Sequence, residues 1–252
     1  SEKEGVALST IPPDIAMCAL CLAEFRDPAN RRFGYPFINC TNCGPRFTIV
    51  TELPYDREHT SMSAFTLCPE CRREYEDPGD RRFHAEPNAC PACGPKLSVA
   101  GPDGRPLKTE DPAGLAASAL RSGEIVAIRG LGGFHLAADA TDDTAVRKLR
   151  ERKFREEKPF AVMVRDLDAA AEIARLSSAD RTILSSPSSP VLLLEAVSPS
   201  PLSPAVAPGL ATVGLFLPYT PLHTFLLAKA GRPLVMTSGN RTDEPIATGN
   251  RE

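Results

Sequence analysis

The second part of the chain, from Asp111 onward, alternates short apolar runs with helical patterns. Asp111-Pro112 is typical of a capped helix start, and Gly123 is typical of the position just after a helix end. The predicted helices cover residues 112–122, 142–153, 167–176 and 221–230, with Thr141 as the cap of the second and a helical turn over 180–184. The predicted strands cover residues 124–129, 134–138, 160–164, 191–196, 213–217 and 234–237. Strands that alternate with helices predict an α/β domain with a mixed sheet.

The first part of the chain has a different texture. Residues 1–15 are polar and are predicted to be an N-terminal extension, and residues 16–99 are rich in turns and hold every cysteine. Residues 100–110 indicate a short hairpin or linker, which leaves 111–252 as the second domain. No apolar run approaches the roughly eighteen residues of a membrane span, and no secretion signal opens the sequence. We therefore expect a cytoplasmic protein with no membrane contact.

The eight cysteines form four Cys-x-x-Cys pairs in a repeating frame. Eighteen residues separate the two pairs of each half, and the whole motif recurs at an offset of 50. Asp27-Pro28, Arg31-Arg32-Phe33 and Cys43-Gly44-Pro45 recur at the same offset. This is a tandem duplication, with copies over residues 16–50 and 66–99. The pairs are Cys18/Cys21, Cys40/Cys43, Cys68/Cys71 and Cys90/Cys93.

Two Cys-x-x-Cys turns at this separation predict a tetrahedral zinc site made of four thiolates. A disulfide framework is the main alternative, but it requires an oxidising compartment. Redox chemistry does not need four copies of the motif. His84 and His59 lack counterparts in the other repeat, so we favour two closed, structural all-cysteine sites. Spacing leaves open whether the ligands pair within or between repeats, and we favour pairing within each repeat.

Charge disfavours nucleic acid as a partner. The 252 residues carry a net charge of −3, and residues 1–100 hold 11 Lys and Arg against 14 Asp and Glu. Binding to a phosphate backbone requires a basic face, which the cysteine-rich part lacks. Its expected role is packing or protein contact.

A basic cluster ends the predicted helix 142–153. Residues 147–158 hold seven Lys and Arg against three Glu. A solvated helix face would explain Arg147, Lys148 and Arg150. The positions after the helix end favour a different role, since a basic turn that enters a buried strand lies at a sheet edge, where open α/β folds bind ligands. We expect this turn to bind the phosphates of a nucleotide, and its predicted phosphate ligands are Lys153, Arg155 and Lys158.

Two glycine-containing loops follow predicted strands. Ser238-Gly239-Asn240 places a hydroxyl and an amide on either side of a glycine, which suits an anion or a metal, although the same tripeptide also forms ordinary turns. Gly130-Leu131-Gly132-Gly133 lacks the helix that a dinucleotide fingerprint requires after it. His135 and His223 lie beside turns and are either structural or functional.

In combination, these motifs resemble the HypF family, the carbamoyltransferases of [NiFe]-hydrogenase maturation. The resemblance rests on the doubled cysteine frame, the basic turn and Ser238-Gly239-Asn240, and it covers residues 16–252. It implies a YrdC-like mixed, twisted sheet with helices, preceded by a loop-rich tandem zinc-finger module. Arg129 to Leu136 looks like the substrate-side loop of that family. The implied cofactor- and substrate-binding residues are Arg129, Gly132, Gly133, Phe134, His135, Tyr219, Thr220 and His223.

The resemblance also implies a reaction. In HypF proteins, carbamate released from carbamoyl phosphate attacks ATP to form carbamoyl-adenylate, and the group passes to the terminal cysteine of HypE. We therefore expect ATP and Mg²⁺ besides two zinc ions, and a HypE-like acceptor as partner. Lys153, Arg155 and Lys158 would neutralise phosphate and carbamate charge, and Ser238 and Asn240 would bind phosphate or Mg²⁺. We expect the acylphosphatase and transfer domains to be absent from this sequence and the adenylating domain to lack its last elements.

Two other functions fit parts of the sequence. One is a threonylcarbamoyl-adenylate synthase for tRNA modification, against which the doubled zinc module argues. The other is a non-catalytic zinc scaffold that docks a partner protein.

Overall fold

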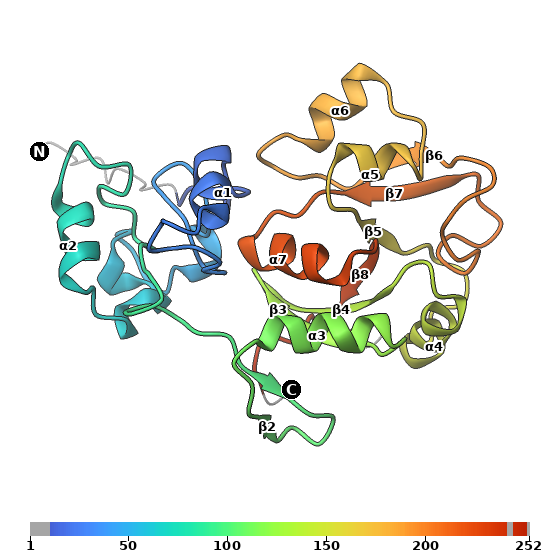
Figure 1. Ribbon diagram of the computed structural model, residues 1–252, viewed down its shortest axis with the longest axis horizontal. Coiled ribbons are helices and arrows are strands. Elements are labelled where there is room, and N and C mark those ends of the chain that lie inside the picture. The colour runs from blue at the N-terminus through green and yellow to red at the C-terminus, as the bar shows by residue number, and fades with distance from the viewer. Residues whose placement is uncertain (1–10, 241–243, 251–252) are drawn as a thin grey trace, which may run out of the picture. The chain divides into compact units, whose positions relative to one another are not determined.

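The computed structural model describes residues 11–240 and 244–250 (Figure 1). The chain divides into two compact units, which meet in the sequence at Lys96 and Leu97. The extension predicted over residues 1–15 lies outside the described residues as far as residue 10. Within the described ranges, no helix combines the length and apolar character that crossing a membrane requires.

The first unit consists of short helices joined by turns. Its α-helices, α1 (Ala19–Arg26) and α2 (Pro69–Glu76), each begin directly after the first cysteine of a Cys-x-x-Cys pair. Three 3₁₀ turns connect the repeats: η1 (Phe47–Ile49), η2 (Arg57–His59) and η3 (Ser61–Ala64). Apart from cysteines and alanines, the buried apolar side chains described here are Phe25, Tyr35, Ile38 and Met62. A core this small stabilises a chain of this length only weakly, so the unit needs a further source of folding energy.

The second unit is built on a mixed sheet of six strands in the order β3-β4-β8-β5-β7-β6, which confirms the predicted fold class. Only β5 and β7 run parallel; the other neighbouring pairs are antiparallel. The last strand in the sequence, β8, therefore lies inside the sheet, between β4 and β5. The strands are β3 (Val126–Gly130), β4 (Gly133–Asp139), β5 (Ala161–Met163), β6 (Leu192–Glu195), β7 (Thr212–Phe216) and β8 (Leu234–Ser238), and a separate hairpin is formed by β1 (Val99–Ala100) and β2 (Pro106–Leu107).

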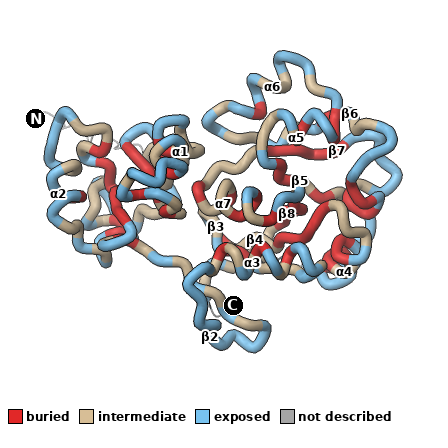
Figure 2. The backbone as a smooth tube through the Cα atoms, viewed as in Figure 1, coloured by how far each residue is buried: buried red, intermediate tan, exposed pale blue. Residues whose placement is uncertain are grey.

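Helices cover both faces of this sheet. On one face, α3 (Pro112–Arg121) and α7 (Pro221–Ala230) pack on apolar residues of the sheet such as Ile128, Ala137 and Met236. The second core contains residues of α4 (Asp143–Lys153), α5 (Leu167–Ala171) and α6 (Ser178–Leu184). Figure 2 shows the result, with many buried residues in the inner strands such as β7 and β8 and mostly exposed residues in the surrounding loops.

The element types agree with the sequence prediction, and many boundaries shift by one or two residues; three differences in the helices are the most informative. The prediction that Thr141 caps α4 is wrong: Asp142 is the cap, and its carboxylate accepts hydrogen bonds from the backbone N–H groups of Thr144 and Ala145 at 2.9 and 3.1 Å. The predicted helix 167–176 ends at Ala171, because the following residues leave it to pair with the end of β6. The helical turn expected over 180–184 is a full helix that begins at Ser178.

The α4 cap yields a test. We expect Asp142→Ala to lower the free energy of unfolding of the second unit by about 1 kcal/mol, because two N–H groups at the helix start lose their acceptor. Urea denaturation followed by circular dichroism measures this change. The control is Glu151→Ala, an exposed acid near the end of the same helix, which we expect to leave stability unchanged. A loss no larger than that of the control would contradict the assignment.

Candidate functional site

The thiols gather into two four-cysteine clusters, one in each repeat, and both lie in the first unit. The Sγ atoms of each cluster all lie within 4.8 Å of one another. Neighbouring Sγ atoms lie 3.5 to 3.8 Å apart, whereas ligands around a tetrahedral zinc lie about 3.8 Å apart and disulfide sulfurs about 2 Å apart. The clusters are Cys18, Cys21, Cys40 and Cys43, and Cys68, Cys71, Cys90 and Cys93. The cysteines thus cluster within each repeat, in agreement with the pairing favoured from the sequence, and the two clusters fit two zinc ions.

The backbone turns that carry the second cysteine pairs need glycine. Gly44 adopts a φ of +99°, and a Cβ built there would lie 2.6 Å from the Cβ of Asn39. A Cβ on Gly94, the equivalent residue of the second repeat, would lie 2.1 Å from the hydroxyl of Tyr35. The repeated Cys-Gly-Pro motif is therefore a packing requirement of the knuckle.

Neither histidine of the first unit belongs to a cluster, as predicted. His84 adopts a φ of +46°, close to the +64° of its counterpart Gly34, and its ring packs against Tyr75 and Phe83. His59 faces the carbonyl of Pro54, with its Nδ1 at 2.9 Å from that oxygen. Each cluster therefore consists of four cysteine sulfurs, without a histidine nitrogen.

In the second unit, the basic turn meets the end of β8. Lys153 is 6% exposed, and its ammonium group donates to the carbonyl oxygens of Ser238 and Asn240 at 2.6 and 2.9 Å and to Asn240 Oδ1 at 3.1 Å. Burial, with the nearby charge of Arg155, lowers the pKa of Lys153. Two segments more than eighty residues apart thus come together around one buried cation.

Arg155 lies beside the same strand. Its guanidinium donates to Thr237 Oγ1 at 3.1 Å and to the carbonyl oxygens of Lys158 and Pro159 at 3.1 and 2.6 Å, and it stacks over the ring of Phe160. Burial lowers its pKa. Arg155 therefore joins the basic turn to β8 and adds a second positive charge at this edge.

Arg150 shows where the helix-face interpretation is wrong. Arg147 and Lys148 do lie on the surface, but Arg150 is 9% exposed. Its guanidinium donates to the carbonyls of Arg155, Glu156 and Lys158 and, through other atoms, to those of residues 205 and 206. Because the chain turns back on the end of α4, these carbonyls need a donor, and Arg150 supplies it.

Lys158 is the predicted phosphate ligand that the structure does not bring to the end of β8. Its side chain is exposed, and its carbonyl serves as an acceptor for Arg150 and Arg155. Among the described residues, the assembled set is Lys153, Arg155, Ser238 and Asn240.

The Ser238-Gly239-Asn240 loop is tightly ordered. Ser238 Oγ donates to Asn240 Oδ1 at 2.6 Å, and Asn240 Nδ2 donates to the carbonyl of Glu244 at 2.6 Å. A Cβ on Gly239 would lie 2.8 Å from the carbonyl oxygen of Phe134, so only glycine fits against β4 here. The loop presents a hydroxyl and an amide next to the buried Lys153 and the partly buried Arg155, which suits an anionic ligand.

The substrate-side loop predicted at residues 129–136 forms the turn between β3 and β4. Gly132 and Gly133 have φ values of +77° and +146°. The backbone N–H of Phe134 donates to the carbonyl of Ala247, and the carbonyl of Phe134 accepts from the N–H of Gly239. A Cβ on Gly133 would lie 2.9 Å from the carbonyl oxygen of Ala247, so residues 246–247 take the space beside it. Arg129 is exposed and donates to Asn250 Oδ1 at 2.8 Å. Ligand contacts of this turn remain a prediction.

A group of partly or fully buried rings lies behind the loop. His135 is the direct cross-strand partner of Ser238, and its ring centroid lies 6.1 Å from that of His223 in the first turn of α7. Tyr219 packs on His223 at 4.6 Å, while Thr220 caps α7. Among the described residues, neither ring nitrogen of His223 nor Nδ1 of His135 has a hydrogen-bond partner. Burial lowers the pKa of both rings, that of His223 to about 3, so both are neutral near pH 7.

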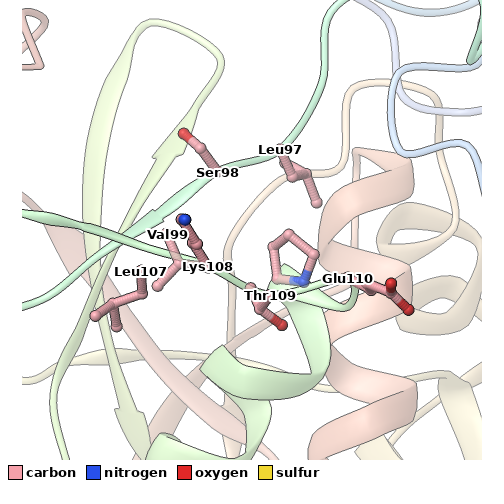
Figure 3. A pocket seen from close by; sticks show the side chains of 8 residues that line it. Leu97, Ser98, Val99, Leu107, Lys108, Thr109 and Glu110 are labelled. Carbon is pink, nitrogen blue, oxygen red and sulfur yellow. The ribbon is translucent and has the colours of Figure 1, made fainter.

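Elsewhere in this unit, a hollow of about 620 Å³ lies between the β1–β2 hairpin and the start of α3 (Figure 3). Its wall includes Leu97, Leu107, Lys108 and Glu110. None of the predicted site residues lines it. It is therefore distinct from the cluster at the end of β8.

Comparison with known proteins agrees with this geometry. The Sua5/YciO/YrdC family profile, described as "Telomere recombination", matches residues 118–252. A profile described as "HypF finger" matches residues 17–50 and 67–100. The chain belongs to the Sua5/YciO/YrdC family and is a HypF homologue. The sequence-based resemblance is thereby confirmed.

Its HypF relatives are longer. The chain is 51% identical to "Carbamoyltransferase HypF2" of Cupriavidus necator, with all of this chain and 33% of that protein aligned. It matches the crystal structure of full-length HypF "in the phosphate- and nucleotide-bound form" at 47% identity and TM-score 0.90, over 96% of this chain and 32% of that one. It matches T. kodakarensis HypF at 44% identity and TM-score 0.93, over 100% of this chain and 34% of that one. The chain thus spans about a third of the HypF proteins it matches.

A more distant relative is named for a different enzyme activity. "Threonylcarbamoyl-AMP synthase" of Bacillus subtilis is 31% identical over 56% of this chain and 42% of its own length.

Metal removal provides one test of the HypF fingers. We expect two zinc ions per chain by elemental analysis, and we expect a strong chelator to unfold the first unit, because metal binding supplies its folding energy. Hydrogen exchange measured by mass spectrometry should show loss of protection over residues 18–95 while the sheet of the second unit keeps its protection. A protected first unit after complete zinc removal would contradict a metal-dependent fold.

The buried rings provide a second test, in the acidic range. Unfolding returns His223 to an ordinary pKa of about 6.5, so the unfolded state binds more protons below that pH and stability falls as the pH drops from about 7 towards 4. The slope for one ring reaches about 1.4 kcal/mol per pH unit. We expect His223→Phe to reduce this slope in urea denaturation, whereas Tyr219→Phe should preserve it. Equal slopes in His223→Phe and the wild type would contradict the assignment.

Proposed function

We propose that the second unit binds ATP at the end of β8 and forms carbamoyl-adenylate, within a carbamoyltransferase of [NiFe]-hydrogenase maturation. The observation that carries this proposal is the hydrogen bonding of the buried Lys153 ammonium to Ser238 and Asn240. It joins a basic turn to a loop of anion-binding groups at one edge of the sheet. The HypF relative whose structure is described as phosphate- and nucleotide-bound supports the choice of ligand.

The chemistry needs positive charge that is already in place. The carbamate oxygen attacks the α-phosphorus of ATP, the bond from that phosphorus to the bridging oxygen breaks, and pyrophosphate leaves. Negative charge grows on the phosphoryl oxygens, and fixed cations lower the energy of that state without reorganising. Lys153 and Arg155 are held by hydrogen bonds to backbone oxygens, so their charges are preorganised. Mg²⁺ would share the phosphate charge.

The individual residues have separate roles in this proposal. Lys153 orders the loop and contributes charge, Arg155 contributes charge beside Thr237, and Ser238 and Asn240 bind phosphate or Mg²⁺. Lys158, which is exposed, would reach the outer phosphates from solvent. His135, which pairs across the strand with Ser238, would contact the carbamoyl end of the substrate as a neutral ring.

In the proposed pathway the carbamoyl group then passes to a HypE-like acceptor. That protein, and carbamoyl phosphate as the source of carbamate, are proposals that follow from the HypF relatives. The zinc fingers would act as a structural module, since four thiolates leave no open coordination position.

A threonylcarbamoyl-AMP synthase is the second candidate, supported by the 31% identity to the Bacillus subtilis enzyme. Both candidates adenylate a carbamate, so ATP binding alone does not separate them. Pyrophosphate exchange does. We expect exchange with ammonium carbamate, which supplies the substrate directly, and none with threonine and bicarbonate; the reverse result would favour the second candidate.

The cation at the loop gives the mutational test. We expect Lys153→Met to lower ATP–pyrophosphate exchange by about 10²- to 10³-fold, because the proposed phosphate site loses a fixed positive charge and the loop that carries Ser238 and Asn240 loses the cation that holds it. Lys148→Met is the matched control: it removes a surface lysine of the same helix, paired with Glu124, and should leave exchange unchanged. Calorimetry with ATP and Mg²⁺ gives an independent readout. No heat from the folded, zinc-loaded wild type would mean that this unit is a scaffold.

A further inference from the structure

Each zinc-finger repeat places arginine side chains against the cysteine cluster of the other repeat. Arg31 and Arg32 belong to the first repeat, and their guanidinium groups lie 3.3 and 3.5 Å from the Sγ of Cys71 in the second. Arg81 belongs to the second repeat and donates to the Sγ atoms of Cys18 and Cys21 at 3.4 and 3.0 Å. Arginines of each repeat thus contact metal-site cysteines of the other repeat, an arrangement that we call the arginine exchange.

Carboxylates complete the exchange with the same symmetry. Arg31 and Arg32 pair with Glu74 of α2 at 2.6 and 2.5 Å. Burial alone would raise the pKa of Glu74, but the hydrogen bonds from these two arginines lower it to about 2. Arg81 and Arg82 pair in the same way with Glu24 of α1, the residue fifty positions before Glu74. Every member of one set therefore has its counterpart in the other.

The second arginine of each pair, Arg32 or Arg82, is buried and also binds the backbone of the other repeat. Arg32 is 2% exposed and donates from Nε to the carbonyl of Ala89 at 2.9 Å; Arg82 is 4% exposed and donates from Nε to the carbonyl of Asn39 at 3.1 Å. Both acceptors directly precede a metal-site cysteine. The knuckle of one repeat is therefore held by the other repeat, as in an isologous dimer contained in a single chain.

The physical consequence concerns charge. Four thiolates and one Zn²⁺ carry a net charge of −2, and burying such a charge is costly unless cations or donors face it. Here those cations come from the opposite repeat. A repeat without metal has too small a core to hold its own arginines in place, because its folding energy comes from zinc. Zinc binding at one site therefore folds that repeat and positions its arginines next to the thiolates of the other site.

A purely structural ion pair between arginine and glutamate would not require these sulfur contacts. Arg81 donates to Cys18 and Cys21 of the first cluster as well as to Glu24, so its guanidinium bridges the carboxylate and the metal ligands. The same holds for Arg31 at Cys71 and Glu74.

We propose that the two tetrathiolate sites bind zinc as one cooperative unit, in which the exchanged arginine pairs make occupancy of either site raise the zinc affinity of the other. The coupling is reciprocal, as linkage requires. It is a property of the paired fingers and does not depend on the function proposed for the second unit.

Zinc titration of the full chain tests the coupling. Starting from reduced, metal-free protein, native mass spectrometry counts chains with no, one and two zinc ions. Independent, equal sites would put about half of the chains in the one-zinc form at half saturation. We expect the one-zinc form to stay well below that level. A one-zinc population at or above it overturns the proposal.

Arginine variants test the exchange itself. Cysteine alkylation and peptide mass spectrometry during a chelator challenge report which cluster loses its metal. We expect Arg32→Met, in the first repeat, to speed zinc loss first at Cys68–Cys93 by about ten- to a hundredfold. Arg82→Met should show the mirror pattern, with Cys18–Cys43 affected first. Arg72→Met, which breaks an exposed pair with Glu76 on α2, is the control and should match the wild type.

The direction of these losses is decisive. A merely destabilised repeat would lose its own metal first, whereas the exchange predicts that the opposite cluster is the first to open. Loss from the repeat that carries the substitution, or no difference from Arg72→Met, would overturn the proposal. If a variant fails to fold with zinc, the wild-type titration still decides whether the sites are coupled.

Discussion

The candidate site of the second unit depends on one buried ammonium group. Taking a lysine charge out of water is unfavourable unless oxygen atoms replace the solvent, and the end of β8 offers three such atoms to Lys153. This requirement ties the end of α4 to the Ser238-Gly239-Asn240 loop. It also explains why the loop is so constrained, because its carbonyl groups must turn towards the cation while Gly239 packs against β4.

Two other cations near Lys153, those of Arg150 and Arg155, also donate to backbone oxygens. Arg150 satisfies the carbonyls of the basic turn, and Arg155 joins the turn to Thr237. Arginine suits this work because its planar fork donates in several fixed directions at once. The result is a positively charged edge that the fold itself holds in place, which is the property that the proposed adenylation would require.

The two units solve the folding problem in different ways. The second buries a continuous apolar core on each face of a six-stranded sheet, with helices on both sides. The first has a small core and relies on clustered thiolates, buried arginines and carboxylates. We therefore expect the stability of the first unit to depend on bound metal. The exchange of arginines makes its two repeats a single structure, although each carries a complete set of cysteines.

Local patterns determined much of this protein from the sequence alone. Cysteine spacing sets metal geometry within a few residues, so the two all-cysteine sites could be predicted. Strand and helix periodicity predicted the fold class of the second unit. The basic turn and Ser238-Gly239-Asn240 were identified because both follow or precede buried strands. The repeat of Arg31-Arg32 at Arg81-Arg82 was visible too, but nothing local indicates where a guanidinium will point.

Only the tertiary structure decided the long-range partners. Strand order places β8 beside β4, which brings His135 next to Ser238, and the return of the chain after α4 turns Arg150 inward and leaves Lys158 exposed. It likewise decided that Arg31, Arg32 and Arg81 contact cysteines of the opposite repeat. The physical reason is that side-chain period and spacing report local conformation, whereas the pairing of buried charges depends on which distant backbone groups the fold leaves unsatisfied.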